Sequence, residues 1–288
     1  MLVAVDFSQS SRLALEGSLP LCRKLGAKLL LVHAWNPGGW VDDPELAQES
    51  SSWLARALEA ARKRLEDWAD SARASGLEVE TLLEPGRASQ RIPAIAQSRS
   101  VELTVLGSQG RAGLEHASLG SVSERVVRLG RCPVLVIPRT DVPFDAPRRL
   151  LVGIDFSLGS RQALDVALRL ARQLGAARGV LLAHAHPGER ETWLESWSEL
   201  AYQKDKPYDA PELERWVPPA SDVPCAIQAV EGRAELALLE LARAESCDWI
   251  VVGKEGHGLL ASLLLGSTTD RVLKLADRPV LVVPSPAA

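Results

Sequence analysis

The sequence predicts an α/β protein in which two doubly wound domains, each built on a five-stranded parallel sheet, follow one another in tandem. Three observations lead to this fold class. Short apolar runs alternate with amphipathic helical segments, and 288 residues suit two cores better than one. A glycine pattern at 107–121 also recurs in register at 253–267. We therefore expect domains at 1–140 and 148–288, joined by a linker at 141–147.

The composition is that of a globular protein, with 46% hydrophobic and 24% charged residues and a formal net charge of −4. This charge lacks the basic footprint of proteins that bind nucleic acid through phosphates. No apolar stretch reaches the roughly 18 residues of a membrane span, and no export leader is evident. The four cysteines show no C-x-x-C pairing. We expect a cytoplasmic protein with reduced thiols, no zinc site, no nucleic-acid partner and no membrane insertion.

The first half opens with a valine-rich run at 2–6, which predicts a buried strand. Serines after it offer N-caps for a helix that Gly26 ends. The run at 28–34 predicts a second strand, and 44–75 predicts a long helix with apolar residues every three or four positions. The stripe expected to face the sheet consists of Leu54, Leu58, Ala61, Leu65, Trp68 and Ala72.

The remaining segments of this half continue the alternation. They predict an edge strand, a short helix, a strand, a helix and a proline-bounded strand, at 77–83, 88–97, 103–106, 121–129 and 132–138. In the last helix we expect Val122, Val126 and Leu129 to face inward.

The second half repeats the series, with Asp155 in the place of Asp6 and Gly232-Arg233 in the place of Gly86-Arg87. The chief difference is 187–223, which is less regular and predicts no single long helix. Its tryptophans are Trp193, Trp197 and Trp216. Either they form a partner surface or they cover the flank of the second sheet; the second interpretation is favoured.

Both glycine loops have the spacing G-x2-G-x9-G-S. In an open parallel sheet, ligands bind beyond the carboxyl ends of the strands, where strand order reverses. There, Gly107 would let a ligand approach the backbone, and Gly110 would permit a turn that aims amide N–H groups inward. Gly120 and Ser121 would open a helix whose free N–H groups attract phosphate. A nucleotide phosphate chain is the expected ligand.

Asp6 and Asp155 follow the first strand of each half. A carboxylate beside phosphates repels them unless a cation such as Mg²⁺ intervenes, or unless it faces the ribose or the base. A turn or N-cap aspartate is equally consistent with the local sequence. The recurrence beside an equivalent loop favours the ligand interpretation.

These residues resemble the universal stress protein family over essentially the whole chain, as a tandem pair. The family's ATP-binding motif has the same glycine spacing, and SVSERVVRLGRCPVLVIP and STTDRVLKLADRPVLVVP look like its closing helix and strand. The resemblance implies an adenine nucleotide alpha hydrolase-like fold with strand order 3-2-1-4-5. It places the aspartates near base and ribose, and the backbone around Ala34 and Ala185 at the adenine. The implied site residues for ATP, or a related adenine nucleotide with Mg²⁺, are Asp6, Ala34, Gly107, Gly110, Gly120, Ser121, Val122, Asp155, Ala185, Gly253, Gly256, Gly266, Ser267 and Thr268.

The resemblance also implies a stress-response regulator with slow or no hydrolysis. Family members often dimerise through the last strand, so 134–137 and 280–283 are expected to form an intramolecular pseudo-dimer, with homo-oligomers as a further option. Two alternatives remain open, an interaction scaffold with one or both pockets empty and an enzyme that transfers phosphoryl or nucleotidyl groups. The sequence has no P-loop and no G-x-S-x-G elbow. We therefore assign no catalytic residue.

A few residues invite a second interpretation. Lys254 and Glu255 replace a serine and a glutamine of the first loop; the lysine could pair with phosphate, while its acidic neighbour partly offsets it. His184 and His186 lie on one side of a strand, but a structural role is favoured over a metal pair because no third ligand is evident. Two loop histidines, His116 and His257, are weaker candidates for phosphate contact.

Overall fold

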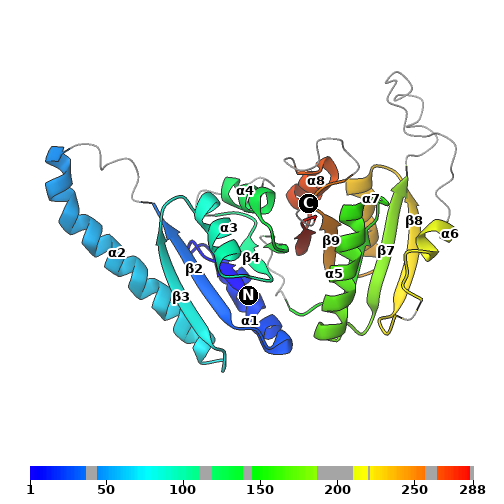
Figure 1. Cartoon of the computed structure of the whole chain (residues 1–288), viewed down its shortest axis with the longest axis horizontal. Helices are drawn as coiled ribbons and strands as arrows, with labels where there is room; N and C mark the ends of the chain where they lie inside the picture. The colour runs from blue at the N-terminus through cyan, green and yellow to red at the C-terminus, as the bar shows by residue number, and fades with distance from the viewer. Residues whose placement is uncertain are drawn as a thin grey trace, which may run out of the picture. The chain divides into compact units, whose positions relative to one another are not determined.

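The computed structural model describes residues 1–36, 44–110, 119–138, 145–186, 210–219, 221–256 and 265–285. The chain divides into two compact units, Met1–Asp145 and Ala146–Ala288 (Figure 1). Most of the predicted linker at 141–147 lies outside the described residues. Each unit is considered by itself, and the expected pairing of the last strands stays a prediction.

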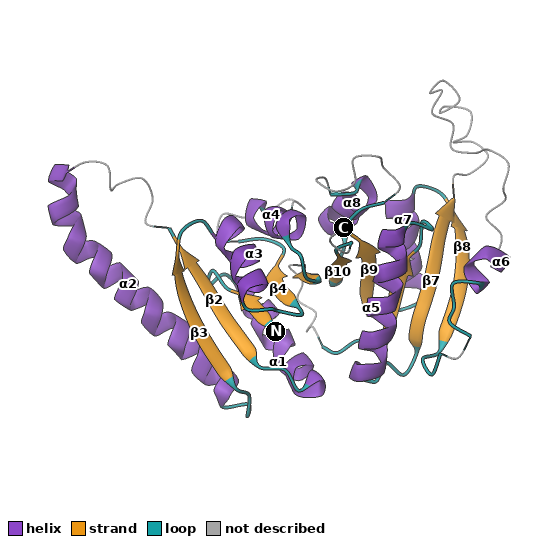
Figure 2. Ribbon diagram, in the orientation of Figure 1, coloured by secondary structure: helices purple, strands orange, loops and turns teal. Residues whose placement is uncertain are grey.

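The first unit alternates strands and helices throughout (Figure 2). Its strands are β1 (Leu2–Ala4), β2 (Leu29–Trp35), β3 (Val79–Pro85), β4 (Thr104–Gly107) and β5 (Val134–Ile137). Its helices are α1 (Gln9–Leu25), α2 (Pro44–Arg73), α3 (Ala88–Ser98) and α4 (Ser121–Leu129). Every neighbouring pair of strands is parallel, in the order β3-β2-β1-β4-β5. The α/β fold class and this strand order are confirmed.

The second unit repeats the arrangement. Its strands are β6 (Arg149–Gly153), β7 (Gly179–His186), β8 (Cys225–Glu231), β9 (Trp249–Gly253) and β10 (Val280–Val283). Its described helices are α5 (Leu158–Leu174), α6 (Ala210–Glu214), α7 (Ala234–Ala244) and α8 (Ser267–Leu275). The parallel order is β8-β7-β6-β9-β10. Strand order therefore reverses beside β1 in one unit and beside β6 in the other.

Helices cover both faces of each sheet, which explains why the central strands are almost wholly apolar and buried. Because parallel crossovers are right-handed, α1 and α2 lie on one face of the first sheet, and α3 and α4 lie on the other. The contacts agree, since α3 packs against α4, and α7 packs against α8 in the second unit.

Helix α1 begins and ends as its sequence predicts. The Ser8 hydroxyl accepts a hydrogen bond from the Ser11 N–H at the N-cap, and Gly26 closes the helix in the left-handed conformation. Ser157 and Gly175 do the same for α5. The serine caps fix where each first helix starts, three residues after the aspartate.

The predicted inward face of helix α4 is partly wrong. Val126 faces inward as predicted, but Val122 and Leu129 are 39% and 45% exposed. Ser123 is buried instead, because its hydroxyl donates to the Gly107 carbonyl oxygen at 2.7 Å. That hydrogen bond turns the helix away from the face that the apolar pattern indicated.

The sheet-facing stripe of α2 is confirmed only in its second half, where Leu65, Trp68 and Ala72 are buried. Leu54 and Leu58 are half-buried. A helix of 30 residues spans about 45 Å, whereas the seven residues of β3 span about 23 Å. The sheet is too short to cover the whole helix, and α2 extends well past β3 in Figure 1.

Candidate functional site

A carboxylate stands directly beyond the first strand of each unit. The Ser8 N–H donates to Asp6 Oδ1 at 3.0 Å, and the Ser157 N–H donates to Asp155 Oδ1 at the same distance. This bond from a side chain to the N–H two residues on is an Asx-turn. The turn interpretation is therefore correct for one oxygen of each carboxylate, Oδ1.

The second carboxylate oxygen, Oδ2, faces the glycine loop. A Cβ added to Gly110 would lie 2.7 Å from Asp6 Oδ2, and one added to Gly256 would lie 2.8 Å from Asp155 Oδ2. Any larger residue at these positions would press on the carboxylate. The second glycine of the motif therefore keeps space free beside the aspartate.

The first glycine of the motif has a packing role that was not expected from the sequence. A Cβ on Gly107 would lie 2.6 Å from Ser10 Cβ and 2.8 Å from its carbonyl carbon, and one on Gly253 would lie 2.7 Å from the Gly159 carbonyl carbon. The missing side chain thus lets the first turn of α1 or α5 pack against the end of the strand. Gly107 and Gly253 therefore serve helix packing, and the close approach of a ligand to them stays a prediction.

The helix after each loop opens towards the same place. Gly120 and Gly266 are the N-caps of α4 and α8, and neither cap has a side-chain hydrogen bond. The first N–H groups of a helix have no partner within the helix, and they carry its positive dipole end. Ser121 and Ser267 begin these helices. Both helix starts are therefore suited to receiving an anion.

A strand edge completes the site on its other side. The Val32 carbonyl accepts from the Val5 N–H at 2.8 Å, so the backbone of Val32 faces β1. Alternate residues of a strand share a side, so Ala34 presents its N–H and C=O in the same direction, beyond the end of β1. Ala185 is in the same position, because the Ala183 carbonyl accepts from the Ile154 N–H at 2.8 Å.

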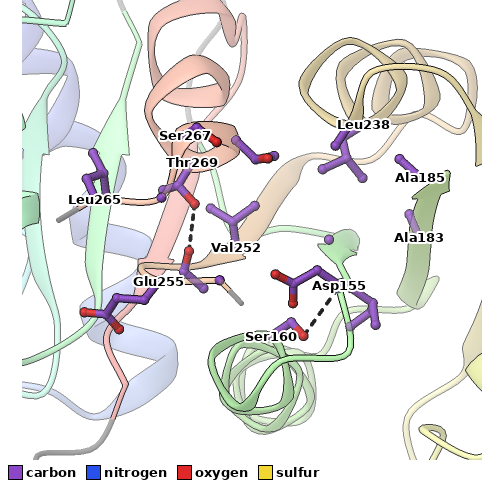
Figure 3. A pocket seen from close by; sticks show the side chains of 17 residues that line it. Asp155, Ser160, Ala183, Ala185, Leu238, Val252, Glu255, Leu265, Ser267 and Thr269 are labelled. Carbon is purple, nitrogen blue, oxygen red and sulfur yellow. Dashed lines mark hydrogen bonds between the residues drawn. The ribbon is translucent and has the colours of Figure 1, made fainter. Parts of the chain in front are cut away.

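These groups surround one pocket in each unit, with cavities of about 640 Å³ in the first and about 380 Å³ in the second. Both volumes fall in the range of small-molecule sites. All seven site residues expected for the first unit line its pocket, and so do all seven expected for the second. In Figure 3 the Asp155 carboxylate lies between α5 and the β9 loop, with Ala183 and Ala185 opposite.

A sequence model of the universal stress protein family matches this chain twice, at residues 1–138 and again at 147–284. The chain belongs to the universal stress protein family. The two matches cover the two units, so each unit is one family domain, in tandem.

Universal stress proteins of Mycobacterium tuberculosis (strain ATCC 25618 / H37Rv) are among its relatives. Rv2005c is 34% identical over 198 residues, which are 67% of this chain and 66%, just under two thirds, of that protein. Rv1996 is 30% identical over 309 aligned positions, covering 99% of this chain and 95% of that protein. Among solved structures, a universal stress protein from Archaeoglobus fulgidus DSM 4304 has a TM-score of 0.74 at 23% identity, covering 99% of this chain and 96% of that one. This last likeness shows the common fold.

Some residues that line the universal stress protein pockets were missed from sequence. Ser123 and Thr269 hold the loop, since each hydroxyl donates at 2.7 Å to the carbonyl of the first motif glycine. The sequence does contain a signal for Ser123 and Thr269, because each bears a hydroxyl and follows the last motif glycine by three residues. Ser11 and Ser160 are also pocket residues, and each hydroxyl accepts from the aspartate N–H at 3.4 Å.

The Lys254 ammonium pairs with its neighbour rather than standing ready for phosphate. Its Nζ lies 3.3 Å from Glu255 Oε1, and the two side chains are only 12% and 9% exposed. Glu255 Oε2 also accepts from the Ser285 N–H at 3.2 Å. Figure 3 shows the Glu255 carboxylate directed away from Asp155. The lysine and the glutamate form a local ion pair at the end of β10.

His184 is a structural residue. It is buried, and its Nδ1 lies 2.7 Å from the Ile154 carbonyl oxygen. Burial is the main cause that lowers the pKa of this imidazole. No cluster of metal-ligating side chains occurs among the described residues. The loop candidates His116 and His257, and also Trp193 and Trp197, lie outside them.

The described helices include none that is both long and apolar enough to cross a membrane. The longest, α2, carries charged residues along its length. The expectation of a cytoplasmic protein stays a prediction.

Proposed function

We propose that each unit binds ATP or a related adenine nucleotide and that the bound nucleotide regulates the protein in a stress response. One observation carries the proposal. In both units an aspartate oxygen, an uncapped helix start and an exposed strand edge face the same cavity. The aspartate oxygen is complementary to the ribose hydroxyls, the helix start to the phosphates, and the strand edge to the base.

The phosphates would bind at the start of α4 or α8. Gly120 and Ser121 in the first unit, and Gly266 and Ser267 in the second, line the cavities at these ends. Backbone N–H groups and a helix dipole stabilise negative charge there without a lysine or an arginine. This matches the finding that Lys254 is paired with Glu255.

The ribose and base would lie towards the first and second strands. Asp6 Oδ2 is directed at the pocket side of the loop, where it can accept hydrogen bonds from ribose hydroxyls. The N–H and C=O of Ala34 can pair with an acceptor and a donor on the adenine edge. Ala88 and Ile92 line the cavity and provide apolar contact for the ring.

If Mg²⁺ accompanies the nucleotide, the phosphates must supply most of its ligands. The described residues contain no group of three carboxylate, histidine or cysteine side chains that could hold an ion alone. Asp6 and Asp155 place an oxygen beside the second motif glycine of each loop, and either could contribute one oxygen. When bound, the ion would neutralise phosphate charge beside the aspartate.

We propose slow hydrolysis at most. In the described pocket linings, the titratable side chains are Asp6 and His33 in the first unit and Asp155 and Glu255 in the second. Glu255 is ion-paired with Lys254. The His33 Nδ1 lies 2.7 Å from the Val5 carbonyl oxygen, which fixes the ring in the core. A positioned general base for water is therefore not assembled by these residues.

The test begins with the purified chain. Denaturation should release an adenine nucleotide, or calorimetric titration with ATP, ADP, AMP and cyclic AMP should show binding at two sites per chain. Asp6→Asn should weaken one site by about tenfold, since a charged hydrogen-bond acceptor is lost, and Asp155→Asn should weaken the other.

Asp67→Asn is the matched control, because Asp67 is exposed on α2 and lies outside the described pocket linings. It should leave both sites unchanged. Absence of released nucleotide together with no heat of binding for all four compounds would refute the proposal.

A further inference from the structure

Two non-glycine residues beside the pockets adopt a backbone conformation that L-residues rarely populate. Phe7 and Phe156 each have φ of 64°. Phenylalanine has no side-chain group that could favour the left-handed region, so such a residue is a genuine outlier and persists only where its surroundings hold it. Each follows directly the aspartate of its pocket.

The left-handed residue lies at the centre of the Asx-turn. It turns the chain between Asp6 and Ser8, so that the Ser8 N–H returns to Asp6 Oδ1 at 3.0 Å. The same turn joins Asp155 to Ser157. With Oδ1 held, Oδ2 has a fixed position beside the motif glycine. The conformation of the phenylalanine therefore determines where the second carboxylate oxygen, Oδ2, lies.

In the first unit, the first aromatic cluster (Phe7, His33 and Trp68) holds this conformation. The Phe7 ring centroid lies 4.5 Å from that of His33 and 5.4 Å from that of Trp68, with an edge-to-face angle of 87° to the tryptophan. The Arg64 guanidinium stacks 4.7 Å above the Phe7 ring, and its Nη2 donates to the Phe7 carbonyl at 3.4 Å. The Arg12 guanidinium stacks on Trp68, 4.9 Å from its ring centroid.

The second aromatic cluster (Phe156, His184 and Trp216) reproduces this geometry. The Phe156 ring lies 4.7 Å from His184 and 5.5 Å from Trp216, at angles of 45° and 79°. Arg161 stacks on Trp216 at 5.5 Å and donates to its carbonyl oxygen at 3.3 Å.

The backbone that carries the tryptophan differs between the units. Trp68 lies inside the 30-residue helix α2, whereas Trp216 lies in a turn after the five-residue helix α6. The two tryptophan rings nevertheless lie at similar distances from their phenylalanines, 5.4 and 5.5 Å, and both are edge-to-face. The two units therefore share the position of the tryptophan ring beside the phenylalanine, although different elements carry the tryptophan.

We propose that Trp68 and Trp216 are positioning residues for the pocket aspartates. Each holds its phenylalanine in the left-handed conformation and thereby aims one carboxylate oxygen at the ribose hydroxyls of a bound nucleotide. This inference rests on the proposed function. It assigns to the crossover segment between the second and third strands of each unit a role in nucleotide selectivity.

The experiment compares ATP with 2′,3′-dideoxy-ATP, which lacks the hydroxyls that the carboxylate would accept from. The wild-type chain should bind ATP about tenfold more tightly, as expected for hydrogen bonds to a charged group. In the double variant Trp68→Leu, Trp216→Leu, this preference should fall towards unity, mainly through weaker binding of ATP. Leucine stays apolar but is smaller and lacks the aromatic edge.

Trp53→Leu is the matched control, because Trp53 lies on the same helix α2 and is 58% exposed. It should keep the full preference. Arg64→Gln provides a second variant whose exposed position puts folding at little risk. This substitution removes the cation that stacks on Phe7 and changes nothing in the second unit. Only the site of the first unit should therefore lose its preference for ATP over the dideoxy compound.

The outcomes separate this inference from the proposed function. If ATP and the dideoxy compound weaken equally, or if the variants keep the wild-type ratio, the positioning role is refuted while nucleotide binding stands. If the wild-type chain binds ATP without a preference for the ribose hydroxyls, the role is likewise refuted. If the wild-type chain binds neither compound, the proposed function itself fails.

Discussion

The first pocket lies beside a helix of 30 residues, and the second lies beside a segment whose described helix has five. Despite this, the phenylalanine φ is the same in both units, and the aspartate hydrogen bonds have the same length. Within the described part of the glycine loops, the two units differ at 108–109 and 254–255, where serine and glutamine in the first unit correspond to lysine and glutamate in the second. The aspartate, the motif glycines and the helix start are the same in both pockets, while the scaffold around them varies.

Removing the lysine of the second loop is expected to have the largest effect on stability. Lys254→Met would leave the Glu255 carboxylate nearly buried without its ammonium partner, although it would still accept a hydrogen bond from the Ser285 N–H. Removing one charged partner of a buried ion pair costs about 3 kcal/mol of stability. Urea unfolding of the full chain should show a decrease of that size in the free energy of unfolding of the second unit.

The control installs the residues of the first loop. The double variant Lys254→Ser, Glu255→Gln removes both charges, and it should stay within about 1 kcal/mol of the wild-type free energy of unfolding. A double variant as unstable as the single one would show that the ion pair is not the reason for the difference between the loops.

The two motif glycines of the first loop should separate stability from binding. Gly107→Ala forces a Cβ to within 2.8 Å of the α1 backbone, and overpacking of this kind costs about 2 kcal/mol. Gly110→Ala meets only the end of the Asp6 side chain, which can move. It should leave the melting temperature nearly unchanged and weaken nucleotide binding at the first pocket.

Thermal unfolding and calorimetric titration of the two variants provide the test, and Gly253→Ala and Gly256→Ala repeat it in the second unit. Equal losses of stability from both substitutions would contradict the separate roles of the two glycines.

The smallest expected effect is a pH dependence of the second unit. Burial lowers the pKa of His184 below its ordinary value of 6.5. The unfolded chain therefore binds a proton more readily than the folded one. Stability from this residue is complete above pH 6.5, and it is lost as the pH falls below 6.5 towards the folded-state pKa.

His184→Asn can still donate to the Ile154 carbonyl but does not titrate. Its unfolding free energy should change less than that of the wild-type chain when the pH is lowered from 7 to 5. Parallel pH curves for the two proteins would contradict the assignment.

Much of the fold could be predicted from local chemistry. The buried valine-rich runs, the caps at Ser8 and Gly26 and the edge character of β3 all depend on short-range preferences that the sequence displays. The glycine spacing likewise identified the pocket, because a backbone that must come close to its neighbours leaves a glycine in the sequence.

Where a prediction was wrong, a contact distant in sequence was responsible. Val122 was expected to face inward, but the Ser123 hydroxyl bonds to Gly107 and rotates α4. Leu54 was expected on the sheet, but β3 ends before α2 does. Periodicity indicates which residues share a face and does not indicate how far the neighbouring element extends.

The sequence by itself determined the two units, the order of their elements, and the aspartates and glycines that line each pocket. Only the tertiary structure decided which carboxylate oxygen faces the glycine loop, why Gly107 must lack a side chain, and which tryptophan packs against each left-handed phenylalanine. The reason is physical. Local preferences act through neighbouring residues, whereas the orientation of a carboxylate depends on rings and backbone groups that the folded chain brings from other elements.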